Sequence, residues 1–452
     1  MKLNKYKYLL GLDSEFHLNN VFIICSYLLS VFPILTFGFR TIMIVVWTFF
    51  GIVTFFKNRG FQVKFDKYNK LIIVFLTTSF VLLIFSLSYS ENISTGINRL
   101  TVMVPMVLLP KIFYLNKRTF TKKRIDWIIS FFCCSVIIFV LYQMLLLLFN
   151  FDIITNDLSI SEIKRNNLHH LSSISQDQIQ QIKIRRLRNF ILKLVDSHPT
   201  YQGLWISFVV FWLISKLKSD WRQLKYKIPA ILVVGMLIFW MFVISARMPI
   251  LASIVAIILT WILFKGVSIR TFSCIILFSI ITLFSLNTFI KPINTKVSEI
   301  VDNVFTLPTK GNDIYNFNST NVRSGIYYCD GILVKENWLF GTGIGDMQAE
   351  LSACYDEKIG AKVYKWQSYN SHNQYLFFLI SSGVLALFSF CCFLFYSFRK
   401  MIILGNTLLF YALAVICIVM LTENIISRSD GVLFFGLFVS LILLSSKNKV
   451  KI

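Results

Sequence analysis

Long apolar runs with few charged residues recur along this 452-residue chain, and their length limits what it can fold into. The hydrocarbon core of a bilayer is about 30 Å thick, and a helix of roughly 20 residues crosses it. A helix also satisfies its own backbone hydrogen bonds, as hydrocarbon requires. The sequence therefore predicts an all-α integral membrane protein with about twelve transmembrane helices. The predicted spans are 19–38, 41–56, 70–89, 99–115, 127–150, 200–216, 228–245, 248–265, 270–289, 374–396, 403–422 and 431–446.

The composition argues against an ordinary soluble domain. Hydrophobic residues make up 56% of the chain and charged residues only 15%, whereas soluble domains hold about 25% charged residues. The basic N-terminal segment runs directly into a full-length apolar span with no small-residue cleavage site. We therefore expect no cleavable signal peptide.

The net charge of +23 has two explanations, a nucleic-acid partner or membrane topology. Lys and Arg gather in the segments on the side of the N-terminus. The short loops on the other side hold one arginine each: Arg40, Arg99, Arg247 and Arg428. Because cytoplasmic loops are enriched in Lys and Arg, we predict that both termini are cytoplasmic. The charge then reflects topology, and no nucleic-acid partner is expected.

Two polar segments interrupt the apolar runs. Segment 151–198 has isoleucines and leucines at roughly helical spacing in its later half, which fits either an interfacial amphipathic helix or a solvated loop. Segment 291–372, called the lid below, is long enough for a mostly helical extramembrane unit. Its residues 323–338 predict a helix resting on the membrane, and the GTGIG turn precedes a second short helix. The predicted regions are 1–150 with spans one to five, 151–198 outside, 199–290 with spans six to nine, 291–372 as the lid, and 373–452 with spans ten to twelve and a cytoplasmic tail.

Arg247 is the first candidate for a functional residue. It lies in the stretch ISARMPIL, between the seventh and eighth predicted spans at the outer boundary. A guanidinium stays charged and binds phosphate with two parallel hydrogen bonds. The alternative is a loop arginine whose side chain reaches the lipid headgroups.

Two of the five histidines stand where a polar segment re-enters the membrane. His198 precedes the sixth span and His372 precedes the tenth. An imidazole accepts a proton from a hydroxyl group at neutral pH, although either residue alone would equally fit a helix cap or an interfacial anchor. No carboxylate lies inside a predicted span, and Glu423 and Asp430 are interpreted as residues at span ends. The absence of intramembrane carboxylates disfavours an ion-coupled transporter.

Cysteine placement leaves one pairing open. Seven of the nine cysteines lie in predicted spans, where they pack as small apolar residues. The other two, Cys329 and Cys354, both lie in the lid. An oxidising compartment would permit a disulfide between them, and two free buried thiols would give the same sequence.

Three short motifs, in this order, resemble the O-antigen ligase and polymerase superfamily of bacterial membrane glycosyltransferases. The first is SARMP, which contains Arg247. The second is Arg323 with Glu336 and the GTGIG turn. The third is the pair His372 and Asn373 before the next helix. The resemblance covers roughly 190–440 together with the number of spans.

The resemblance implies a GT-C type enzyme of the bacterial inner membrane that takes glycan from undecaprenyl diphosphate on the periplasmic side. Arg247 and Arg323 would bind the diphosphate and stabilise its negative charge, and His372 would deprotonate the attacking sugar hydroxyl. His198 and Asn373 would contact substrate. Membrane lipid surrounds the protein, and neither a metal nor another cofactor is implied.

Three functions remain to be compared. A ligase would use a sugar of lipid A-core as acceptor, and a polymerase would use another carrier-linked repeat unit. The His-Asn pair and the single helical lid favour the ligase. A polysaccharide flippase or transporter would call for internal repeats and charges along the bundle interior, and the sequence shows neither.

Overall fold

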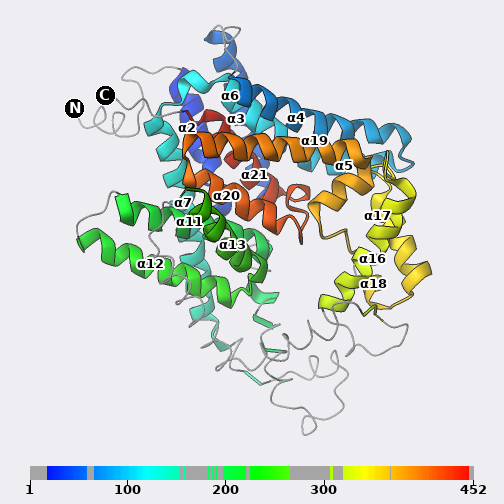
Figure 1. Cartoon of the computed structure of the whole chain (residues 1–452). Helices are drawn as coiled ribbons and strands as arrows, with labels where there is room; N and C mark the ends of the chain where they lie inside the picture. The colour runs from blue at the N-terminus through cyan, green and yellow to red at the C-terminus, as the bar shows by residue number, and fades with distance from the viewer. Residues whose placement is uncertain are drawn as a thin grey trace.

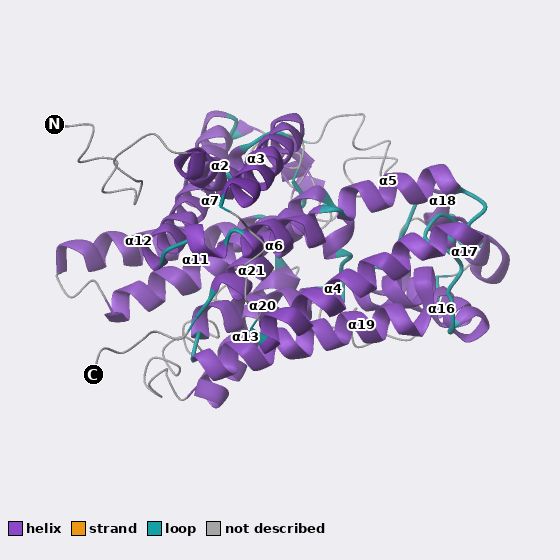
Figure 2. Cartoon of the chain, turned by 90° about the horizontal axis from the view of Figure 1, so that it is seen from above, coloured by secondary structure: helices purple, strands orange, loops and turns teal. Residues whose placement is uncertain are grey.

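The computed structural model describes residues 18–58, 66–152, 156–157, 179, 182–183, 186–187, 189–191, 197–219, 224–264, 306–308, 319–366 and 368–446. Within these residues the regular secondary structure is entirely helical (Figures 1 and 2). The expectation of an all-α protein is therefore confirmed for the described chain.

Six helices or helix pairs are long and apolar enough to cross a membrane. They are α3 (Phe37–Lys57), α4 (Lys67–Phe85) with its short extension to Tyr89, α5 (Ile93–Met103) with α6 (Pro105–Leu115), α7 (Lys122–Phe149), α13 (Arg247–Phe264) and α19 (Gln374–Leu404). Shorter apolar helices are α2 (Leu18–Ser30), α12 (Leu224–Val243), α20 (Thr407–Val419) and α21 (Ser429–Leu444). The helix α11 (Pro199–Ser219) covers the predicted sixth span.

This pattern supports a multi-pass membrane protein, whereas the number twelve stays a prediction. The predicted ninth span, 270–289, lies outside the described residues, as does most of 151–198. Between 179 and 191 the described positions of that segment are helical, and Ile182 and Ile191 are buried.

The first predicted span, 19–38, is wrong as a single helix. α2 ends at Ser30, and a 3₁₀ turn, Phe32–Ile34, follows with Pro33 in its first turn. Proline has no backbone N–H to donate and disrupts a continuing helix. The next helix, α3, therefore begins at Phe37 and takes up the end of the predicted span.

Helices α4 and α19 run side by side, and the lid lies at one end of this pair (Figures 1 and 2). α19 is interrupted at Gly383, whose φ of 76° is open to glycine. A β-carbon there would collide with the Leu339 carbonyl. Val384 donates a backbone hydrogen bond to Trp338 (2.9 Å), and Thr342 donates one to Ile380 (2.7 Å). The lid backbone is thus inserted into the break in α19.

The lid contains α16 (Ser319–Asn337), α17 (Met347–Cys354), a π-turn (Tyr355–Ile359) and α18 (Val363–Trp366). A disulfide joins Cys329 to Cys354, one of the two alternatives left open by the sequence. On the face of α16 expected to rest on the membrane, Ile326 and Leu333 are buried by protein, whereas Trp338, which directly follows the helix, is 53% exposed. The helix was predicted correctly, and its contact with the membrane stays a prediction.

The GTGIG segment forms the expected turn and also joins the lid to the membrane helices. Ile344 and Gly345 donate backbone hydrogen bonds to the hydroxyls of Ser86 and Ser90, both at 3.1 Å. The Asp346 carboxylate accepts the N–H groups of residues 91 and 92 at 2.7 and 2.8 Å. These bonds fix the lid over one end of the helical bundle.

Candidate active site

The ends of several helices meet at one end of the bundle, beginning with α11 and α20. The two helices are antiparallel. The Tyr411 hydroxyl of α20 donates to the Ser207 carbonyl (3.3 Å), and the Tyr201 hydroxyl donates to the Asn424 carbonyl (3.4 Å). His198, which precedes α11, therefore lies at the same end as the loop that follows α20.

Helix α13 brings Arg247 to this end as well. Its last residue, Phe264, packs against Phe410 at the beginning of α20, with ring centroids 5.2 Å apart. At its other end, Pro249 and Ala246 lie against Gly203 of α11. Arg247 is exposed and begins α13, directly after the tight corner that joins α12 to α13. Its backbone therefore stands beside the first turns of α11.

His372 lies immediately before α19 and is held by the loop after α20. Gln374 donates its backbone N–H to the Met420 carbonyl (2.8 Å). The His372 backbone N–H is bound by the Asn370 side chain (2.9 Å). The φ angle of His372 is +44°, which is uncommon for a residue other than glycine. Such a conformation costs about 1–3 kcal/mol and persists only where the surroundings fix it.

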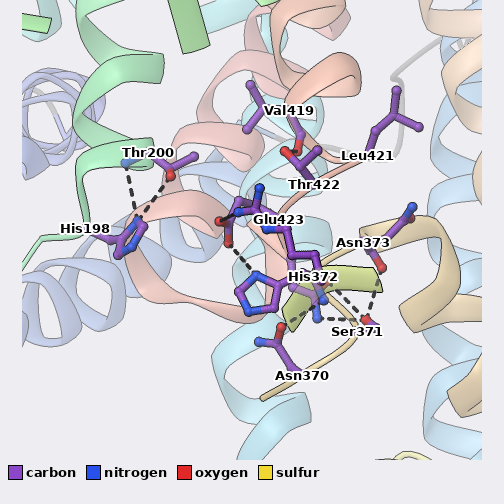
Figure 3. Close-up of polar contacts among 12 residues, drawn as sticks. His198, Thr200, Asn370, Ser371, His372, Asn373, Val419, Leu421, Thr422 and Glu423 are labelled. Atoms are coloured by element: carbon purple, nitrogen blue, oxygen red, sulfur yellow. Dashed lines mark hydrogen bonds and ion pairs between the residues drawn. The ribbon is translucent and has the colours of Figure 1, made fainter. Parts of the chain in front are cut away.

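Glu423 connects two of the predicted site residues (Figure 3). Its Oε2 lies 3.4 Å from Nδ1 of His372, and its Oε1 lies 3.4 Å from Nη2 of Arg323. The Glu423 side chain is only 14% exposed, compared with 24% for His372 and 35% for Arg323. One carboxylate thus joins a lid arginine to the histidine at the start of α19.

The charges around Glu423 determine its ionisation. Burial alone would raise its pKa, but contact with His372 and the positive charges of His198 and Arg323 outweigh burial. The net effect is a pKa below the ordinary value for a glutamate. Glu423 is therefore a carboxylate at neutral pH, as required for an ion pair with either neighbour.

His198 stands across the site from His372 and Glu423 (Figure 3). Its Nδ1 accepts the backbone N–H of Thr200 (3.3 Å) and lies 3.1 Å from the Thr200 hydroxyl. This bond caps the first turn of α11. In the neutral ring the proton is then on Nε2, which can donate a hydrogen bond.

The predicted residues thus divide into three groups. Arg323 and His372 are joined through Glu423, with His198 near enough to influence that carboxylate. Arg247 begins a helix at the same end of the bundle. Asn373 has a structural task, because its side chain caps α19 by accepting the N–H groups of residues 375 and 376 at 2.9 and 3.1 Å. Its contact with substrate remains a prediction.

Two acidic residues interpreted as mere span ends have specific partners. Glu423 belongs to the site, and Asp430 forms a buried ion pair with Arg40. The available signal was the polar stretch LTENIISRSD, which separates the last two spans. Among the residues that the structure describes, no group of three metal-ligating side chains is present.

Comparison with known families addresses the resemblance directly. Residues 230–391 match the family model Wzy_C, described as O-antigen ligase. The chain contains an O-antigen ligase domain. This domain is shared by O-antigen ligases and polymerases, so the expectation of a membrane glycosyltransferase of this family is confirmed. A search of curated proteins with the whole chain gives no match.

The matched region begins in α12 and ends within α19. It contains Arg247, Arg323 and His372, and it ends before Glu423. The carboxylate that joins two of these residues is therefore contributed from outside the O-antigen ligase domain. A domain of this family implies lipid-linked glycan substrates in general, which agrees with a site at the end of a bundle of apolar helices.

Proposed function

We propose that the chain is an O-antigen ligase-type glycosyltransferase of the bacterial inner membrane. It moves glycan from undecaprenyl diphosphate to a sugar hydroxyl of lipid A-core, on the periplasmic side and with inversion at the anomeric carbon. The observation that carries this proposal is the Arg323–Glu423–His372 cluster, which places a base and a cation on one carboxylate. The predicted orientation, with both termini cytoplasmic, puts the cluster outside the membrane.

The acceptor step belongs to His372. With Glu423 facing Nδ1, the Nε2 atom of the ring is available to take the proton of the acceptor hydroxyl. The freed oxygen attacks the anomeric carbon of the donor sugar. Glu423 holds the ring orientation and stabilises the imidazolium that forms, as a buried carboxylate does for the histidine of a catalytic triad.

The donor step belongs to the arginines. The bond from the anomeric carbon to the diphosphate oxygen breaks, and its electron pair leaves with the diphosphate. Arg323 and Arg247 bind the departing anion, because a fixed guanidinium stabilises developing negative charge without reorganisation. In the free enzyme Arg323 forms an ion pair with Glu423, and the donor diphosphate replaces Glu423 as the partner of Arg323 when the donor binds.

The acceptor distinguishes this proposal from a polymerase, which would run the same donor chemistry on a carrier-linked repeat unit. Deleting the gene and separating the surface glycolipids on a gel provides the test. Lipopolysaccharide without any attached glycan supports the ligase. Core carrying a single repeat unit supports the polymerase instead, and unaltered glycolipids would overturn both.

A further inference from the structure

A cleft of about 900 Å³ has His198, one of the predicted site residues, in its lining. Its walls come from the 3₁₀ turn before α3, from the start of α3, from α7 and from the loop that leads into α21. Its lining includes the apolar side chains of Ile34, Phe37, Ile138 and Tyr142, called the outer walls below. It also includes the polar side chains of His198 and Arg428, called the inner end.

The outer walls of the cleft are apolar and exposed. Ile34 is 44% exposed, Phe37 61%, Ile138 55% and Tyr142 52%. Phe37 and Ile138 lie on helices long and apolar enough to span the bilayer. Side chains exposed on such helices face lipid, so a hydrocarbon chain can enter the cleft sideways from the bilayer.

The inner end of the cleft is polar and positively charged. Arg40 and Asp430 line it but neutralise each other in a buried ion pair. Arg428 is exposed and makes no ion pair with a residue of the described chain. The inner end therefore offers an uncompensated guanidinium together with the imidazole of His198, a combination suited to an anionic group.

The polar inner end of the cleft lies close to the active site. His198 lines the cleft and also contributes positive charge that lowers the pKa of Glu423. Arg428 and Glu423 belong to the one loop between α20 and α21. Figure 3 shows His198 to one side of Glu423 and His372. The polar residues of the cleft thus lie near the catalytic cluster, although Arg323, His372 and Glu423 do not line it.

We propose that this cleft binds the polyisoprenyl chain of the donor and that Arg428 contributes to binding its diphosphate, together with the two arginines of the proposed active site. The inference rests on the proposed function and names the path of its donor. In a lipid diphosphate the reacting sugar, the diphosphate and the hydrocarbon chain are joined directly. The chain must therefore enter the membrane within the length of one diphosphate from the catalytic residues. The sugar hydroxyl of an acceptor glycolipid is separated from its own lipid by further sugars and has no such requirement.

Gly38 and Gly235 offer a matched pair of variants to test the path. Gly38 lines the cleft, Gly235 lies on α12 away from it, and a β-carbon at either position meets nothing within 4 Å. The full chain in nanodiscs is labelled with a photoreactive polyprenyl diphosphate, and the labelled peptides are identified by mass spectrometry. We expect label on residues 34–38 and 138–142, at least tenfold less label in Gly38→Trp, and no change in Gly235→Trp.

Competition experiments test the headgroup and the class of lipid. Arg428→Gln should weaken competition by unlabelled polyprenyl diphosphate about tenfold, leaving competition by the uncharged polyprenol unchanged. Arg399→Gln, which removes an exposed arginine of α19 outside the cleft, is the control. Label outside the cleft, or phosphatidylglycerol competing as well as the diphosphate, would overturn the inference. Labelling needs no acceptor, so a chain that labels in the cleft without transferring glycan would refute only the proposed function.

Discussion

Replacing Glu423 with glutamine should slow glycan transfer about a hundredfold without disrupting the fold. When His372 takes the acceptor proton, its new charge lies 3.4 Å from the Glu423 carboxylate. Two unit charges at that separation attract by about 5 kcal/mol at an effective dielectric constant of 20 and by about 1 kcal/mol in water. Because the two side chains are 24% and 14% exposed, an intermediate value of about 3 kcal/mol applies. That energy corresponds to roughly a hundredfold in kcat.

The same substitution, which slows transfer, should not weaken the binding of the donor. Glu423 competes with the donor diphosphate for Arg323, so Glu423→Gln should leave the donor KM unchanged or lower it. The assay measures transfer from a lipid-diphosphate glycan by the purified chain in nanodiscs, at several donor concentrations. Glu350→Gln, which removes an exposed carboxylate from α17, is the control. A Glu423→Gln enzyme with kcat within threefold of wild type would refute the role of this carboxylate.

Three further predictions concern stability, each followed by thermal unfolding of the purified chain. Asp330 is fully buried in the lid, and burial raises its pKa from 3.8 to about 8. Between these values the unfolded chain has released a proton that the folded lid keeps, so stability falls as pH rises, by up to about 1.4 kcal/mol per unit. Asp330→Asn should remove this slope, and an unchanged slope would contradict the assignment. Gly383→Ala should lower the unfolding temperature and expose the lid to protease, whereas Gly405→Ala, which has the strain of positive φ but open space around the added β-carbon, should lower the unfolding temperature less and leave the lid protected. Asp430→Asn leaves the charge of Arg40 buried without its partner and should cost about 3–5 kcal/mol. An apolar replacement of both residues should recover most of that loss.

Hydropathy predicted the helices well because a spanning helix depends mainly on its own residues. The exceptions arise from single residues that end or begin a helix. Pro33 breaks the first predicted span, and the Asn92 side chain caps α5 by accepting the Thr95 N–H (3.1 Å), so that helix begins before the predicted residue 99. The mean hydropathy of a segment does not reveal either the helix-ending proline or the capping asparagine.

The site was predicted in part, because its members are distant in sequence. His372 stood out as a histidine where a polar segment re-enters the membrane, and Arg323 was named through the family resemblance. Glu423 was interpreted as a residue at a span end. Its contact with Arg323 joins residues 100 positions apart, so nothing near Glu423 in the sequence indicates it. Packing of the lid, α19 and α20 creates that contact, and no local pattern encodes it.

Attachment of the lid shows the same limit. The glycines of GTGIG indicated a turn, as the structure has it. The Ser86 hydroxyl that accepts a hydrogen bond from this turn lies 258 positions earlier in the chain. A serine at the end of an apolar span carries no sign of a partner so far away.

The most direct test of the proposed chemistry is single-turnover transfer by the purified His372→Ala chain. Wild-type protein and the variant are mixed in nanodiscs with a glycan on undecaprenyl diphosphate and with lipid A-core, and both donor binding and glycosylated core are measured. We predict that the variant binds the donor as wild type does and forms product at least a thousandfold more slowly. Product formation at the wild-type rate would contradict the assignment of His372 as the base.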